Sequence, residues 1–182
     1  IRDSASTVDG IPDSWIARNF TGGQVFGGPE ADPDRDGCSN FDEFLQRTDP
    51  LKAASKITLT VAADVTRVPE SERRVAVTIL ANVPTQRPLE ISFGVRGSAQ
   101  SGTDYKTVAK LGGVAHLYPG QTKTSVLFDI INDAQKEGPE TLEFYLQPVR
   151  LASLGTKVSH EFVIEDDDDS SLEVFEEWAR QN

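Results

Sequence analysis

The feature that most constrains the fold is a series of short segments in which apolar or β-branched residues alternate with polar ones. Such alternation is typical of strands with one buried face. The segments are 57–61, 75–80, 89–95, 114–118, 122–131, 141–148 and 157–164. Gly, Pro, Asp and Asn separate them, and no helical pattern lies between them. We therefore predict a mainly β chain that forms an Ig-like antiparallel Greek-key β-sandwich.

The sequence on either side of the predicted sandwich has a helical pattern instead. Apolar residues at helical spacing predict one helix near 13–20, with Asp13 or Ser14 as its N-cap, and a second near 41–47. The predicted domains are a helical module (1–54), a β-sandwich (55–169) and a short C-terminal helix that starts a next module (170–182).

An acidic twelve-residue stretch, residues 32–43, reads DPDRDGCSNFDE. It fits the calcium-loop pattern D-x-[DN]-x-[DN]-G-x₅-E at every specified position, and Gly37 permits the sharp turn that such a loop needs. The predicted oxygen ligands are Asp32, Asp34, Asp36, the backbone carbonyl of Cys38, Asn40 directly or through water, and bidentate Glu43. The alternative is an acidic surface turn that matches by chance. The matched positions and the apolar helical stripe around Glu43 favour a calcium site.

Further carboxylates lie where the predicted strands end. They form four groups, namely Glu70 with Glu72, Asp104, Asp133 with Glu137 and Glu140, and Asp166–Asp169. Because successive loops of a Greek-key sandwich alternate between its ends, distant groups can meet at one end. A calcium ion would offset the repulsion between converging carboxylates. The spacing alone equally allows solvated turn residues.

The region 56–169 resembles a Calx-beta domain. The matching stretches are VPESERRVAVTI (68–79), SGTDY (101–105), LYPGQTKTSVLFDIIND (117–133), KEGPETLEFYL (136–146) and VIEDDDD (163–169). The resemblance implies a Calx-beta type sandwich whose calcium ligands are Glu70, Asp104, Asp133, Glu137, Asp166, Asp167 and Asp168. Asn132 stands where calcium-binding members have the first of two adjacent aspartates. That departure implies lower affinity or fewer ions, because ligand charge tunes calcium affinity.

The stretch DPDRDGCSNFDEFLQRTDP (32–50), preceded by IPDSW (11–15), resembles the EF-hand-type calcium loops of thrombospondin type 3 and dockerin-like repeats. Those repeats often carry a second acidic loop. Here Ala5, Thr7 and Ile16 occupy positions where carboxylates would be expected, so we do not expect a complete dockerin.

The charge and the residue content of the chain indicate which classes of binding partner and function to expect. The formal net charge of −11 disfavours nucleic acid and anionic membrane surfaces as partners and favours cations. No apolar run approaches the roughly 18 residues of a membrane span, so we expect no direct membrane insertion. His116 and His160 fall within predicted strands without a nucleophile motif, and the acidic groups do not face each other across a cleft. We therefore do not expect an enzyme.

These patterns lead to one functional expectation. We expect a calcium-binding structural and adhesion module of a secreted or cell-surface, multi-domain bacterial-type protein, in which Ca²⁺ rigidifies loops and joints between modules. Its expected partners are calcium ions, neighbouring modules of the same chain, and a glycan or surface protein. The alternatives are a carbohydrate- or protein-recognition module and the accessory region of a large secreted hydrolase. The sequence contains no Met, which fits a piece of a longer protein.

Overall fold

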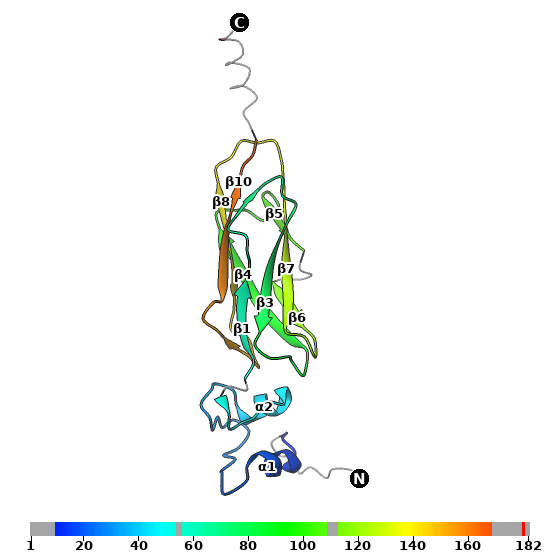
Figure 1. Cartoon of the computed structure of the whole chain (residues 1–182), viewed down its shortest axis with the longest axis vertical. Coiled ribbons are helices and arrows are strands. Elements are labelled where there is room, and N and C mark those ends of the chain that lie inside the picture. Colours follow the sequence, from blue (N-terminus) through cyan, green and yellow to red (C-terminus); the bar gives the residue numbers. More distant parts are fainter. Residues whose placement is uncertain (1–9, 54–55, 109–112, 169–179, 181–182) are drawn as a thin grey trace.

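The structure is a computed structural model that describes residues 10–53, 56–108, 113–168 and 180. Two five-stranded sheets pack face to face, and two short helices lie beyond one end of them (Figure 1). The elements are α1 (Asp13–Asn19), α2 (Asn40–Gln46), β1 (Thr58–Ala62), β2 (Arg67–Pro69), β3 (Arg74–Ala81), β4 (Leu89–Gly97), β5 (Tyr105–Thr107), β6 (Val114–Leu117), β7 (Lys123–Ile130), β8 (Glu140–Leu146), β9 (Ser153–Leu154) and β10 (Ser159–Glu165). The predicted C-terminal helix, 170–182, lies outside the described residues apart from Arg180.

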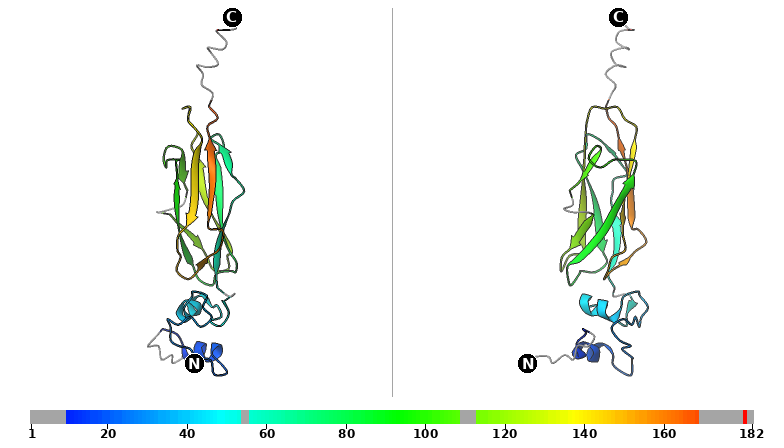
Figure 2. Two further views of the ribbon diagram at one scale, coloured as in Figure 1. Left: turned by 90° about the vertical axis from the view of Figure 1, so that its left-hand side faces the viewer. Right: turned by 180° about the vertical axis from the view of Figure 1, so that it is seen from behind.

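The two sheets confirm the predicted Ig-like β-sandwich. One has the strand order β5-β7-β3-β1-β9 and the other β2-β10-β8-β4-β6. The longer strands pair antiparallel, as β3 does with β7 and β8 does with β4 and β10. Two short edge strands depart from the predicted antiparallel pattern, because β9 pairs with β1 and β2 pairs with β10 in parallel. Figure 2 shows the sheets from two further sides.

The core between the sheets follows from the alternation in the strands. In β3, Val75 and Val77 are buried, while Ala76 between them faces outward. Phe128, Phe144 and Phe162 are each fully buried at the centre of the sandwich. The ring of Phe128 meets Phe162 with centroids 6.0 Å apart and Phe144 at 6.4 Å, both near edge-to-face. These aromatic contacts fix the two sheets against each other.

The helical end of the chain has its own small apolar cluster. The Trp15 ring on α1 packs against Phe20 at 6.0 Å and against Phe44 of α2 at 5.9 Å. The predicted N-cap of α1 is wrong, because Pro12 occupies that position without a side-chain cap and Asp13 is already helical. Proline suits this position because its fixed φ is compatible with the extended backbone of an N-cap, and because it has no backbone N–H that needs a partner. Within the described part of the chain, no helix is long and apolar enough to cross a membrane.

Candidate metal centres

The predicted calcium loop is folded so that its carboxylates converge. One oxygen from each of Asp32, Asp34 and Asp36 lies within 4.8 Å of the others. Backbone N–H groups orient these side chains, since Asp36 N donates to Asp32 Oδ1 at 3.1 Å and to Asp34 Oδ1 at 3.2 Å, and Gly37 N donates to Asp32 Oδ2 at 2.9 Å. Gly37 has φ +92°, which a residue with a side chain rarely adopts. The local backbone thus holds three carboxylates toward one point.

Several oxygens aimed at this loop have no hydrogen-bond partner among the described residues. They include Asp34 Oδ2, Asp36 Oδ2, Asn40 Oδ1 and both carboxylate oxygens of Glu43. Glu43 is 1% exposed and Asn40 is fully buried. The Asn40 amide nitrogen donates to the carbonyls of Phe26 at 2.7 Å and Gly28 at 2.8 Å, which leaves its oxygen for another group. Buried oxygens without protein partners are typical of a cation site.

The charges of the loop also need compensation. Burial, together with the charges of Asp34 and Asp36, raises the pKa of Glu43 from 4.5 to about 8. Burial also raises the pKa of Asp34. The Cys38 thiol has its pKa raised to about 12, first by burial and then by Asp36, so the thiol stays protonated and only its backbone carbonyl suits calcium. This donor set of carboxylate, amide and carbonyl oxygens fits a hard divalent cation.

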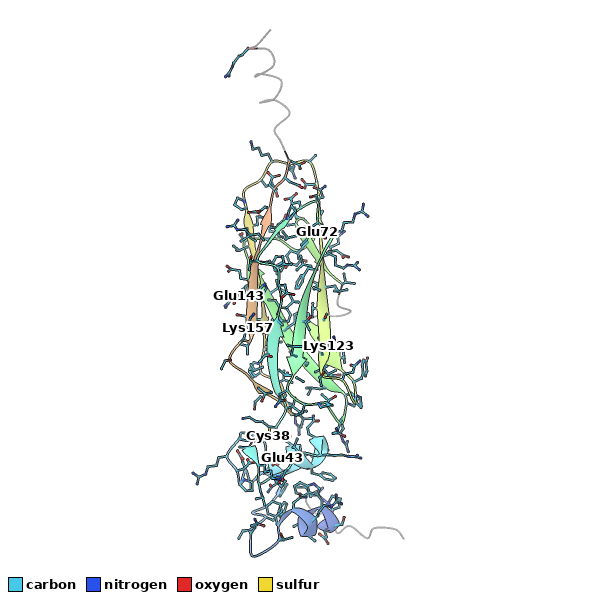
Figure 3. The ribbon with its side chains drawn as sticks, in the orientation of Figure 1. Cys38, Glu43, Glu72, Lys123, Glu143 and Lys157 are labelled. Atoms are coloured by element: carbon cyan, nitrogen blue, oxygen red, sulfur yellow. The ribbon has the colours of Figure 1, made fainter. Side chains whose placement is uncertain are left out.

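Helix α2 brings Glu43 to the loop. Ser39 caps the helix by accepting from Asp42 N at 3.2 Å, and the Asp42 carboxylate accepts from Ser39 N in return. This capping box starts the helix at Asn40, so Glu43 lies in the first turn and faces inward. Figure 3 shows Cys38 and Glu43 close together at the helical end.

The opposite end of the sandwich brings the other carboxylates together in two groups. The first joins Glu70, after β2, with Asp166 and Asp168, after β10. The parallel pairing of β2 with β10 places these loops side by side, and Glu70 N donates to the Glu165 carbonyl at 3.0 Å. In each group the ligand oxygens lie within 4.8 Å of one another.

The second group joins Asp104 with Glu137 and Glu140. Asp104 is 5% exposed, and one of its oxygens accepts from Gln100 N at 2.5 Å. Glu137 N donates to Asp166 Oδ2 at 2.6 Å, which connects this group with the first. We call the two groups together the acidic pole, with the members Glu70, Asp104, Glu137, Glu140, Asp166 and Asp168.

In the acidic pole, as in the loop, burial and repulsion between neighbouring carboxylates disfavour the charged form of the side chains. Burial and the charges of Asp166, Asp133 and Glu137 raise the pKa of Glu70. Burial and the hydrogen bond with Asp104 raise the pKa of Glu140 to about 7. Since protons or a cation relieve such repulsion, the pole can hold a cation between its two loops.

The two groups contain five of the seven predicted ligands of the sandwich. Asp133 and Asp167 lie outside the two groups, and the Asp133 carboxylate accepts from Gln135 N at 2.7 Å. Asp133 is still near enough to raise the pKa of Glu70. Asn132, the departure from the Calx-beta pattern, lines an open 710 Å³ pocket beside Glu70.

Two polar side chains near these centres were missing from the predicted ligand set. Glu140, the first residue of β8, belongs to the acidic pole; the sequence grouped it with Asp133 and Glu137, but the Calx-beta resemblance left it out of the ligand set. Gln46 lies one turn after Glu43, is 3% exposed, and neither of its amide atoms has a hydrogen-bond partner among the described residues. No periodicity in the sequence singles out either residue.

Comparisons with known proteins bear on the fold. No family model matches the sequence, and no curated protein matches it. Among solved structures, the apo-form Calx CBD1 domain matches with a TM-score of 0.53 and 20% identity, over 62% of this chain and 99% of that chain. The sandwich has a Calx-beta-like fold.

Two other solved structures agree with that assignment. The Calx CBD2 domain matches with a TM-score of 0.52 and 11% identity, over 67% of this chain and 94% of that chain. A structure described as the calcium binding domain CBD12 of CALX1.1 matches with a TM-score of 0.51 and 20% identity, over 60% of this chain and 44% of that chain. At these identities the likeness defines the fold of the sandwich and leaves its ligands to be argued from its own residues.

Proposed function

We propose that this chain is a calcium-stabilised structural and adhesion module without catalytic activity. Calcium binds in the loop of residues 32–43 and at the acidic pole, and so rigidifies both ends of the described molecule. The two sites have different roles: the loop orders the helical module, and the pole ties the chain leaving β10 to the loops that precede β3, β5 and β8.

The observation that carries this proposal is the environment of Glu43. The Glu43 carboxylate is 1% exposed, and neither oxygen makes a hydrogen bond of normal geometry among the described residues, although the Thr48 side chain acts to lower its pKa. With the charges of three aspartates also nearby, this carboxylate is costly to bury without a cation. Its position twelve in the loop is where a calcium loop needs a bidentate carboxylate. A proton on Glu43 would relieve only one of these charges.

Support for calcium at the acidic pole comes from two directions. The pole assembles six carboxylates from four separate loops or strand ends. A solved structure with this fold is described as a calcium binding domain. The six carboxylates of the acidic pole supply enough oxygens for at least one ion, even with Asn132 in place of an aspartate.

The setting that best suits such a module is outside the cell. We place the module in a secreted or cell-surface, multi-domain protein, where calcium is plentiful enough to fill weak sites. We also assign residues 10–53 to the thrombospondin type 3 and dockerin-like class of calcium loops, on the motif and its folded geometry. The joint to the sandwich supports a rigidifying role, because Lys56 Nζ donates to the Asp36 carbonyl within the loop at 2.5 Å.

Thermal unfolding of the Glu43→Gln variant tests this function. Wild-type protein should melt at a higher temperature in calcium than in chelator. Glu43→Gln should lose part of that difference and weaken loop binding by at least about tenfold, because it removes a bidentate charged ligand.

Glu30→Gln is the matched control, since Glu30 is exposed and lies just before the loop. It should keep the full calcium-dependent rise. Equal stabilisation of wild type and Glu43→Gln by calcium would contradict the assignment of the loop.

A further inference from the structure

A pocket of 470 Å³ lies where the two helices approach the sandwich. Its walls include the rings of Trp15 and Phe44 and the polar side chains of Asn19 and Thr48. Three arginines from separate parts of the chain complete it: Arg18 from α1, Arg47 from the C-cap of α2, and Arg87 from the loop between β3 and β4. We call this the arginine pocket.

The charge of the arginine pocket is opposite to that of the protein. The chain carries a net charge of −11, yet no carboxylate is among the described residues that line this pocket. Some arginines elsewhere are paired, as Arg74 is with Asp129 at 2.6 Å and Arg96 with Glu143 at 2.6 Å. In the described part of the chain, none of the three pocket arginines forms an ion pair.

The backbone that carries two of these arginines, Arg18 and Arg47, is held in place. Arg47 has φ +58°, and its N–H donates to the Glu43 carbonyl, as the N–H of Thr48 does at 3.1 Å. On α1, Trp15 is 8% exposed and wedged between Phe20 and Phe44. Guanidinium groups on such a frame lose little backbone freedom when a ligand binds.

We propose that the arginine pocket binds a compact anionic carbohydrate, a uronate or sulfated sugar. Guanidinium forks pair with carboxylate and sulfate in bidentate geometry. The Asn19 amide nitrogen donates to the Trp15 carbonyl at 2.9 Å, so the amide oxygen is the part of that side chain left to accept from a sugar hydroxyl. The volume falls within the roughly 300–1,000 Å³ of small-ligand pockets. This site goes beyond the calcium role and does not depend on it.

Charge outside the pocket favours a small anion over a long one. With the three arginines set aside, the rest of the chain carries −11 − 3 = −14. A nucleic acid strand would extend over that negative surface and be repelled, whereas a ligand of one or two sugars stays within the positive patch.

Calorimetric titration tests the site, with the whole 182-residue chain in calcium and five probes: a sulfated disaccharide, a diuronate, the matching neutral disaccharide, inorganic sulfate and a short DNA strand. At least one acidic sugar should bind, and the neutral one should not. Arg18→Gln, Arg47→Gln and Arg87→Gln should each weaken binding about tenfold, as expected for loss of one charge-assisted contact.

Lys123→Gln is the control, because it removes one exposed positive charge on β7 and Lys123 is not among the residues that line the pocket. It should leave the affinity unchanged, and all four variants should melt like wild type in calcium. The proposal is overturned if neither acidic sugar binds, if the three arginine variants bind like the control, or if inorganic sulfate or a short DNA strand binds as tightly as the sugars.

Discussion

Glu43 and Glu140 have pKa values well above their ordinary value of 4.5, in different parts of the molecule. Burial is the first cause for both, followed by neighbouring aspartates. Both groups therefore bind protons more tightly in the folded chain than in the unfolded chain. Their contribution to folding is most favourable below pH 4.5 and is lost as the pH rises through about 7 and about 8.

The stability of chelator-stripped protein should accordingly fall between about pH 5 and pH 8. Calcium should flatten this dependence, since the ion replaces the protons as the compensating charge. Denaturant unfolding at several pH values, with calcium and with chelator, measures both curves.

Glu140→Gln should reduce the fall in stability with pH in chelator, because it removes one of the carboxylates whose pKa is raised, together with its repulsion with Asp104. It should also weaken calcium binding at the acidic pole. Glu161→Gln, at an exposed position on β10, serves as the control and should change neither property. A pH dependence that is identical in Glu140→Gln and wild type would contradict this account of the pole.

At the scale of elements, α2 links helix capping to the candidate calcium loop. The reciprocal hydrogen bonds of Ser39 and Asp42 fix where the helix begins, and that start places Glu43 in the first turn. Asp42 also lies 3.8 Å from Arg150 of the sandwich. The orientation of the last loop ligand therefore depends on a serine that contributes nothing to the site itself.

Ser39→Ala should lower the free energy of unfolding by about 1 kcal/mol, the usual cost of a lost N-cap. It should also weaken calcium binding by the loop, because Glu43 is held less firmly. Chemical denaturation and calorimetry measure the two effects. Ser71→Ala, at an exposed serine with no capping role, is the control. Unaltered calcium affinity in Ser39→Ala would show that the loop positions Glu43 without help from the cap.

The elements that the sequence predicts best are those with long alternation. All seven predicted strands are present, since burial of every second residue leaves a clear pattern over several residues. The strands β2, β5 and β9 were not predicted, because two or three residues carry no readable period. The parallel pairing of β2 and β9 depends on which segments meet in three dimensions, and no local pattern records that.

The candidate sites divide in the same way. The calcium loop is contiguous, so motif spacing alone predicts the convergence of Asp32, Asp34 and Asp36. The acidic pole is assembled from distant loops, and the Calx-beta resemblance pointed to it while missing Glu140. The arginine pocket could not be predicted, because Arg18, Arg47 and Arg87 belong to different elements and share no motif.

At the scale of the whole molecule, the two candidate calcium centres lie at opposite ends. The loop of residues 32–43 belongs to the helical end, and the acidic pole lies at the far end of the sandwich (Figure 1). The sandwich between them is held by its apolar core, so we expect it to form without an ion. Calcium should therefore act on the ends of the molecule, with a stable sandwich persisting in chelator.

Calorimetric titration of calcium into chelator-stripped protein tests the central claim most directly. The account predicts two classes of site, one removed by Glu43→Gln and the other weakened by Glu140→Gln, while each variant keeps the remaining class. Absence of binding heat at any calcium concentration, with melting temperatures equal in calcium and in chelator, would contradict it.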